Sequence, residues 1–357
     1  MLSIIYAFII SSVTLISLYP AAIKFGFVDR PCNRKRHQGN IPLIGGITLF
    51  VSVAFLLSIY PDLIPHSQVF ILCSTILVVI GIIDDLLDIS ALSRLLVIIG
   101  ISVYLVVAID FKIDYLGDLL GTGDILLSEF SMVLTIVAII GALTAFNMVD
   151  GLDGLLGCLA CVTLTALAFL FWFYGQSSLM LFCLLFIAAL IPYILCNLEL
   201  LPKIKMKVFM GDSGSFFIGF TMVWLLIEAS QLREQQLIQQ KVNPVTVLWL
   251  IALPLMDMTA TMMRRMVKKQ SPFKADRGHL HHIFTRLGLS PNRTLLTICF
   301  FALICALIGI LGEIFAVAEV FMFIAFLLLF SLYYYLYCHI WKVTVLVRKL
   351  SGINKKY

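Results

Sequence analysis

Eleven long apolar runs divide this chain, and they limit what it can fold into more than any other feature. Each is roughly 17 to 25 residues long, the length that a helix needs to cross a bilayer. Hydrophobic residues make up 61% of the 357 positions, against about 45–50% in soluble globular chains. We therefore predict an all-α integral membrane protein, a polytopic bundle of about eleven transmembrane helices forming a single domain over residues 1–357. The predicted spans lie near 2–23, 41–60, 68–83, 91–109, 130–148, 155–174, 179–196, 213–229, 245–263, 294–312 and 319–340.

The basic residues give these spans an orientation. If the chain starts outside, all but three of its 25 Lys and Arg residues fall in the inner segments, the exceptions being Lys112, Arg233 and Lys241. Basic residues concentrate in the short cytoplasmic loops of membrane proteins, so we predict a periplasmic N-terminus and a cytoplasmic C-terminus. The first span has no basic residue before it and no small-residue cleavage site after it. We interpret it as a retained anchor rather than a signal peptide.

Four polar motifs fall on the same cytoplasmic face. They are GIIDDLLDIS at 81–90, FNMVDGLDG at 146–154, VFMGDSGS at 208–215 and DRGHLHH at 276–282. A single aspartate at the end of a span is equally well explained as a solvated cap, but that interpretation does not explain a whole set of acids on one face. The predicted active-site loops lie near 24–42, 84–92, 147–154, 197–213 and 264–293.

Asp84 and Asp85 give the first indication of chemistry. They follow an apolar run of only about fifteen residues, which puts them at the hydrocarbon boundary, where an ionised group is costly and tends to be functional. Adjacent carboxylates also repel each other, and a divalent cation or a shared proton is the usual relief. These two acids therefore favour a cation site at the membrane edge.

Glycines and histidines indicate a second kind of chemistry. Gly211 and Gly214 flank Asp212 and Ser213 in front of a predicted span. A glycine-rich helix entry binds phosphate, because its N–H groups and dipole point at an anion, although helix capping alone explains such a motif equally well. The HLHH cluster at 279–282 is open to interpretation as a metal site or as surface imidazoles. Its basic surroundings and the lack of a nearby cysteine favour an anion such as phosphate.

Together these features indicate phosphoryl transfer between a water-soluble donor and a lipid. The alternative class is an ion-coupled transporter, which would place its acids near the bilayer midplane. Here Glu228 and Asp257 lie toward the ends of their spans. The CxxC pair Cys158 and Cys161 lies within a predicted span, and we interpret it as packing rather than redox or metal chemistry. No nucleic-acid partner is expected.

Five segments, in this order along the whole chain, resemble the polyprenyl-phosphate N-acetylhexosamine-1-phosphate transferases, a family of glycosyltransferase 4 type: RKRHQGNIPLIGG, IDDLLD, AFNMVDGLDGL, VFMGDSGS and SPFKADRGHLHH. The resemblance implies transfer of N-acetylglucosamine 1-phosphate from UDP-N-acetylglucosamine to undecaprenyl phosphate, with release of UMP and a need for Mg²⁺ or Mn²⁺. It also implies a multi-pass protein surrounded by the lipid of the bacterial inner membrane, with its active site facing the cytoplasm. The step implied is the first lipid-linked one in synthesis of O-antigen or enterobacterial common antigen, and so of lipopolysaccharide.

The resemblance also implies residue roles, motif by motif. Asp84 or Asp85 would deprotonate or orient the lipid phosphate, and Asp150 and Asp153 are further catalytic candidates. Asn147 and Asp212 would hold the metal. The donor would be bound by Asp153 and Phe209 at the uracil, by Gly211 and Ser213 at the helix entry, and by Arg265, His279, His281 and His282 on the sugar-phosphate side.

Several alternatives stay open. Relatives that use UDP-N-acetylmuramoyl-pentapeptide share AFN..DGLDGL and FMGDSGS, but they carry GTPTMGG where this chain has GNIPLIGG, and their histidine loop continues differently. These departures favour N-acetylglucosamine over that sugar, with UDP-N-acetylgalactosamine as a further option. The sequence leaves open whether the lipid phosphate attacks directly or an enzyme carboxylate attacks first, and whether the protein acts as a homodimer.

Overall fold

The computed structural model of this protein is built almost entirely from helices, and it describes residues 2–30, 39–201, 203, 206–231, 241–272 and 278–339. Short 3-10 turns at η1 (Pro61–Leu63) and η2 (Ser128–Phe130) and an antiparallel pairing of β1 (Val28–Asp29) with β2 (Ile41–Pro42) accompany the helices. The predicted all-α class is confirmed. The helices are α1 (Leu2–Phe25), α2 (Gly45–Ile59), α3 (Ser67–Leu87), α4 (Ala91–Ile109), α5 (Ser131–Val149), α6 (Leu155–Phe173), α7 (Ser177–Asn197), α8 (Gly211–Ser230), α9 (Pro244–Leu250), α10 (Ala252–Val267), α11 (Leu280–Arg286), α12 (Pro291–Ile314) and α13 (Glu319–Cys338).

Most of these helices are long enough to cross a bilayer. Within the described residues, nine pass by length and composition, namely α1, α3, α4, α5, α6, α7, α8, α12 and α13, and the bent pair α9 and α10 makes a tenth if it counts as one span. The remaining predicted span forms α2, whose 15 residues extend only about 22 Å at 1.5 Å per residue, less than the hydrocarbon core of about 30 Å. The chain is a multi-pass membrane protein, and its eleventh crossing stays a prediction.

The predicted span at 245–263 is not one straight helix. α9 and α10 are joined at Ile251 and bent by 80°. Pro254 has no N–H to donate to the carbonyl of Leu250, so the helical hydrogen bonding fails at this point. The Leu250 oxygen instead accepts a hydrogen bond from Thr163 Oγ1 of α6 at 3.2 Å, because a carbonyl buried in a membrane protein needs a partner. The predicted span at 245–263 is therefore a bent pair of helices, a feature that a count of apolar residues does not show.

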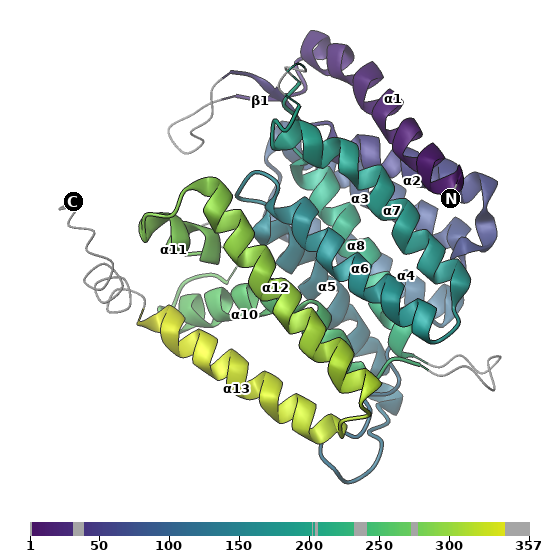
Figure 1. The fold of residues 1–357 in the computed structure, drawn as a ribbon, viewed down its shortest axis with the longest axis vertical. Helices are drawn as coiled ribbons and strands as arrows, with labels where there is room; N and C mark the ends of the chain where they lie inside the picture. Colours follow the sequence, from purple (N-terminus) through teal and green to yellow (C-terminus); the bar gives the residue numbers. More distant parts are fainter. Residues whose placement is uncertain are drawn as a thin grey trace.

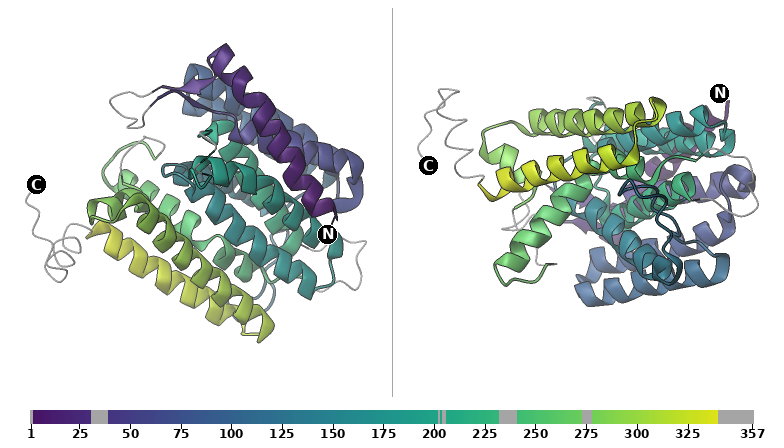
Figure 2. Two further views of the ribbon diagram at one scale, coloured as in Figure 1. Left: turned by 45° about the horizontal axis from the view of Figure 1, so that its top comes forward. Right: turned by 90° about the horizontal axis from the view of Figure 1, so that it is seen from below.

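α8 is the central helix of the bundle. Its apolar stretch is 94% buried, whereas those of α1 and α13 are only 17% buried. Helices α3, α5, α2 and α6 pack around α8 (Figure 1), and α1 and α13 lie at opposite edges of the molecule (Figure 2, left). Because the GDSGS motif forms the first turn of α8, this arrangement puts the motif inside the bundle rather than on its surface.

Glycines bring the neighbouring helices into backbone contact with α8. A Cβ on Gly46 of α2 would overlap the backbone of Gly214, and one on Gly81 of α3 would overlap the backbone of Ser213. Further along α8, a Cβ on Gly219 would lie 2.9 Å from the Cα of Leu143 on α5. Small residues at such crossings let helices in membranes gain dispersion contacts that larger side chains would prevent. The crossings fix how α2 and α3 meet the start of α8.

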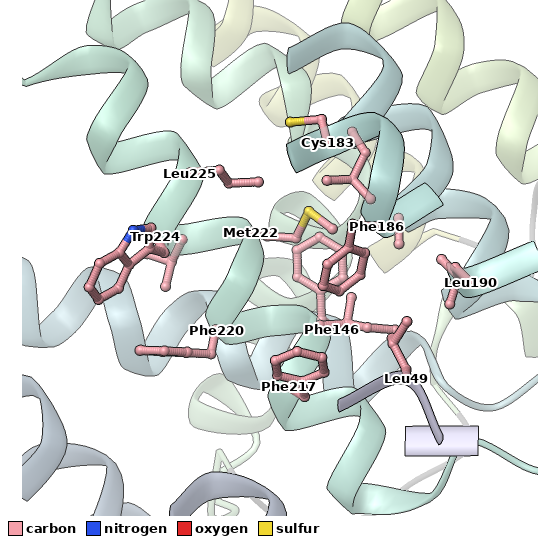
Figure 3. Close-up of a cluster of buried hydrophobic side chains, with 14 of the residues drawn as sticks. Leu49, Phe146, Cys183, Phe186, Leu190, Phe217, Phe220, Met222, Trp224 and Leu225 are labelled. Atoms are coloured by element: carbon pink, nitrogen blue, oxygen red, sulfur yellow. The ribbon is translucent and has the colours of Figure 1, made fainter. Parts of the chain in front are cut away.

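Aromatic side chains fill the rest of the space around α8. Trp224 stacks on Phe111 with ring centroids 4.3 Å apart and meets Phe70 edge to face at 5.2 Å. About two helical turns nearer the GDSGS motif, the ring centroid of Phe217 lies 5.6 Å from that of Phe186 on α7 (Figure 3). Aromatic pairs in these geometries add stability beyond the area they bury. They make α8 a rigid support for the residues at its N-terminus.

Candidate active site

Three of the motifs meet where α3 ends, α5 ends and α8 begins. Asp85 of α3 accepts hydrogen bonds from the backbone N–H of Asp212 at 2.9 Å and of Ser213 at 3.5 Å. First-turn N–H groups have no partner within their own helix, so this carboxylate caps α8 and complements its dipole. Gly211 (φ 74°) makes the approach possible, because a Cβ there would lie 2.5 Å from Asp85 Oδ2. The helix entry predicted to bind phosphate thus carries the Asp85 carboxylate in this state.

Asp84 faces a different set of partners. It is 5% exposed, its Oδ2 lies 2.7 Å from Arg94 Nη1, and its Oδ1 accepts the Ile89 N–H at 3.0 Å. Between these partners the chain leaves α3 through Asp88 in a left-handed conformation (φ 49°) and turns into α4. Neighbouring residues on a helix point about 100° apart, which is why the two adjacent acids serve different contacts.

Asp212, in the first turn of α8, lies beside Asn147 of α5. Asn147 Nδ2 donates to Asp212 Oδ1 at 2.7 Å and to Ser215 Oγ at 2.8 Å. The Asp212 carboxylate also lies close to that of Asp84. Two carboxylates in contact need a shared proton or a cation between them. In this state Asn147 orients Asp212 through its nitrogen, and the amide has to turn before its oxygen can face a cation.

Asp150 follows α5 and completes the acidic cluster. Its burial and the carboxylates of Asp212, Asp85 and Asp153 raise the pKa of Asp150 to about 8, although part of the residue stays exposed. Among the described residues, no ion pair reaches Asp85, Asp150 or Asp212. The cluster therefore holds more carboxyl groups than it has basic side chains to pair with them in the part of the chain that the structure describes.

This donor set fits Mg²⁺. No three His, Cys, Asp or Glu side chains in the described part of the chain are placed to hold a metal by themselves. Mg²⁺ is commonly bound through one or two carboxylates, with waters and substrate phosphates as its other ligands. Asp212 with Asp84, and Asn147 after its amide turns, are the side chains that would hold such an ion.

The residues expected at the uracil lie around the side chain of Lys207. Lys207 Nζ contacts Asp153 Oδ2 at 2.7 Å and Glu199 Oε1 at 2.9 Å. Burial lowers the pKa of Lys207, but the hydrogen bonds to these carboxylates outweigh it and leave that pKa above its usual value. The same ammonium lies 6.0 Å from the centroid of the half-buried Phe209 ring. Asp153 and Phe209 are thus joined through Lys207.

Asn197 fixes the backbone around this group. It is 2% exposed, its Oδ1 accepts the Gly154 N–H at 2.5 Å, and its Nδ2 donates to the Val208 carbonyl at 2.8 Å. One residue further on, the Phe209 carbonyl accepts the Gly45 N–H at 3.0 Å. The loop before α6, the segment before α8 and the start of α2 are therefore held in one network.

The histidines form a second group that touches the first. His279 Nδ1 lies 3.0 Å from Asp257 Oδ2, and the His279 and His281 rings are parallel with centroids 6.0 Å apart. His281 is 4% exposed, its Nε2 has no hydrogen-bond partner, and a Cβ on Gly151 would lie 2.5 Å from that atom. Burial, and then the neighbouring His282, lower the pKa of His281 to about 3. His281 is therefore neutral at physiological pH and packs directly on the MVDGLDG loop.

Two other predicted site residues are buried rather than open to solvent. Arg265 is 2% exposed and donates from Nη1 to the Pro272 carbonyl, which ties α10 to the start of the histidine loop. Ser213 is fully buried and its Oγ has no hydrogen-bond partner. Their contacts with substrate stay predictions. Asp276 and residues 31–38 of the basic N-terminal motif lie outside the described residues.

Sequence reasoning did not assign roles to four residues that organise this site. Arg94 is a lone basic residue at the start of a predicted span, and Lys207 comes two residues before Phe209. Asn197 is a polar residue at the end of an apolar run, and Asp257 is an acid inside one. A buried polar group needs a partner, and this requirement is the signal that could have drawn attention to them.

Comparison with known proteins places this architecture in a family. A family model described as Glycosyl transferase family 4 matches residues 67–230. The protein called undecaprenyl-phosphate alpha-N-acetylglucosaminyl 1-phosphate transferase in Salmonella typhi is 41% identical over 98% of this chain and 94% of its own length. Proteins of the same name are 42% identical in Yersinia pestis, with the same coverage, and 41% identical in Haemophilus influenzae over 100% of this chain and 99% of the relative. The chain belongs to glycosyl transferase family 4.

The match to glycosyl transferase family 4 covers the acidic cluster. Residues 67–230 run from α3 to α8 and include Asp84, Asp85, Asn147 and Asp212. The histidine loop lies beyond that stretch, but the similarity to the three relatives extends through it. Both groups of site residues therefore lie within the part of this family 4 protein that resembles known transferases.

Proposed function

We propose that this protein transfers N-acetylglucosamine 1-phosphate from UDP-N-acetylglucosamine to undecaprenyl phosphate, giving undecaprenyl diphosphate-N-acetylglucosamine and UMP. The observation that carries the proposal is 41–42% identity, along nearly the whole chain, to proteins named for this reaction. The acidic cluster at the ends of α3 and α5 and the start of α8 supports it. The proposed setting is the bacterial inner membrane, with eleven spans, a cytoplasmic active site and a product that starts an O-antigen or enterobacterial common antigen type polysaccharide.

In the proposed reaction an oxygen of the lipid phosphate attacks the β-phosphorus of the donor. The bond from that phosphorus to the bridging oxygen breaks, and UMP leaves with this oxygen. A phosphate monoester has a second pKa near 6, so the acceptor is already largely ionised at neutral pH and needs little help from a base. Asp84 and Asp85 then act through orientation and charge. A bound Mg²⁺ or Mn²⁺ supplies charge neutralisation on the diphosphate.

An assay of purified protein with radiolabelled UDP-sugars tests the function. UDP-N-acetylglucosamine is expected to yield labelled lipid and UMP only when undecaprenyl phosphate and a divalent cation are both present. If only UDP-N-acetylgalactosamine or UDP-N-acetylmuramoyl-pentapeptide were turned over, the proposed transfer reaction would stand but the donor sugar would be a different one. Substrate uptake into vesicles without UMP release would replace the transferase by a transporter.

The same assay without lipid acceptor separates the two mechanisms. With donor labelled in the β-phosphate, direct attack predicts neither label on the protein nor stoichiometric UMP. Covalent label that passes into lipid product on addition of undecaprenyl phosphate would show that an enzyme carboxylate attacks first.

Phe209→Leu tests the uracil contact. Leucine keeps the apolar bulk that anchors the segment but loses the ring, and stacking of a base on an aromatic side chain is worth about 1–3 kcal/mol. We expect the KM for UDP-N-acetylglucosamine to rise at least about fivefold, measured by UMP release at saturating lipid. An unchanged KM would make Phe209 a packing residue only.

Cysteine labelling tests the sidedness of the site. Lys269 and Thr122 are both exposed, after α10 and between α4 and α5 respectively. In a variant without other accessible cysteines, Lys269→Cys is expected to react in whole cells only with maleimides that cross the membrane. Thr122→Cys is expected to react with an impermeant maleimide, because the distribution of basic residues puts its loop outside. The opposite result would reverse the orientation.

A further inference from the structure

Asp257 is a buried carboxylate that does not belong to the acidic cluster and has no role in the proposed reaction described above. It lies on α10, two turns or less from the bend with α9, and is 2% exposed. Its Oδ1 accepts the Leu280 N–H at 3.0 Å and the Tyr333 hydroxyl at 2.8 Å, and its Oδ2 lies 3.0 Å from His279 Nδ1. One carboxylate thus joins α10, the first residue of α11 and α13.

This hydrogen bond determines which ring nitrogen of His279 can contact a ligand. An ionised carboxylate only accepts hydrogen bonds, so Nδ1 carries the proton that it donates to Asp257. Nε2 is then the ring nitrogen left for a ligand.

The pair also determines where the histidine group lies relative to the loop at 147–154. The His279 ring is parallel to that of His281, which packs on Gly151 of that loop. Asp257 accepts two hydrogen bonds at the start of α11, one from the His279 side chain and one from the Leu280 backbone N–H. A change at Asp257 therefore reaches the donor side of the site through His279.

We propose that Asp257 is a positioning residue, which holds His279 in the tautomer and orientation that direct Nε2 to the phosphates of the sugar nucleotide. The proposal rests on the proposed transferase function for its substrate, and on the Asp257, His279, Leu280 and Tyr333 contacts for its geometry. Asp257 itself does not touch substrate.

The first measurement is ¹⁵N NMR of the full-length protein labelled at histidine, which needs no substitution beyond His279→Gln to assign the signal. We expect a protonated Nδ1 in His279 of the unmodified protein. A neutral ring protonated only at Nε2 would overturn the proposal. This readout stands whether or not the protein transfers N-acetylglucosamine 1-phosphate, so failure of the proposed function and failure of the positioning role are distinguishable.

The second measurement is a double-variant comparison of kcat/KM. Asp257→Asn keeps the shape and an acceptor for Leu280 and Tyr333 but offers an amide to Nδ1, which favours the other tautomer, and a roughly 100-fold fall is expected. Because the effect passes through His279, Asp257→Asn combined with His279→Gln is expected to be no more than about threefold worse than His279→Gln alone. Fold losses that multiply would show that Asp257 acts independently of His279 and would overturn the proposal.

Tyr337→Phe is the matched control. It removes the 3.1 Å hydrogen bond between Tyr337 and Thr261, which also joins α13 to α10, without touching Asp257 or His279. Near-normal kcat/KM is expected for this variant. If Tyr337→Phe lost as much activity as Asp257→Asn, attachment of α13 to α10 would explain both results, and the positioning role would be rejected.

Discussion

Asp212→Asn is expected to reduce UMP formation by about 1,000-fold or more while leaving the membrane fold intact. Charge stabilisation by a bound metal is worth several kcal/mol in a transition state, and about 4 kcal/mol corresponds to roughly a 1,000-fold change in rate. Asparagine keeps an oxygen for the Asn147 amide, which donates to Asp212 Oδ1 at 2.7 Å, and it keeps the backbone N–H that Asp85 caps. The measurement is UMP release over a range of Mg²⁺ concentrations.

Asp62→Asn is the control for this experiment. Asp62 is an exposed acid in η1, which follows the C-terminal end of α2. The Gly45 contact with Phe209 lies at the opposite, N-terminal end of α2. The same change of charge there is expected to leave UMP release and its Mg²⁺ dependence unaltered. Normal turnover of Asp212→Asn at ordinary Mg²⁺ concentrations would remove Asp212 from the metal site.

Gly81→Ala is expected to cost about 3 kcal/mol of stability and most of the activity. Its Cβ would overlap the backbone of Ser213 and Asp212, so no side-chain rotation can relieve the contact, and overpacking of this kind costs about 1–3 kcal/mol or more. Separation of α3 from α8 would also move Asp85 away from the Asp212 N–H. The measurements are the temperature at which the detergent-solubilised protein loses its monodisperse peak, and UMP release.

Gly100→Ala is the matched control on α4, because a Cβ there meets nothing within 4 Å. Alanine is favoured over glycine inside a helix by about 0.5–1 kcal/mol, so this variant is expected to be as stable as the original protein or more so. Equal behaviour of the two alanine variants would show that the contact between α3 and α8 is looser than the structure indicates.

The acidic motifs illustrate how far sequence patterns reach. A helix that crosses a bilayer needs about 20 residues, so counting apolar runs is enough to predict that residues 84–85, 147–153 and 208–215 lie at the ends of helices. The α3, α5 and α8 helices confirm those positions. The count does not show the bend at 245–263, where Pro254 interrupts the helical hydrogen bonding and Thr163 donates to the Leu250 carbonyl instead.

The sequence by itself determined that this is a membrane protein, where most of its long apolar helices lie and which acids stand at their ends, because composition and apolar length act locally along the chain. Only the tertiary structure decided what those acids contact. Asp85 accepts the backbone N–H groups of a helix that begins 126 residues later in the chain, at Gly211. Asp257 reaches His279 only after the bend at Ile251 turns α10. Such contacts depend on helix crossings set by glycines such as Gly81, and a crossing requires the shapes of two distant segments at once.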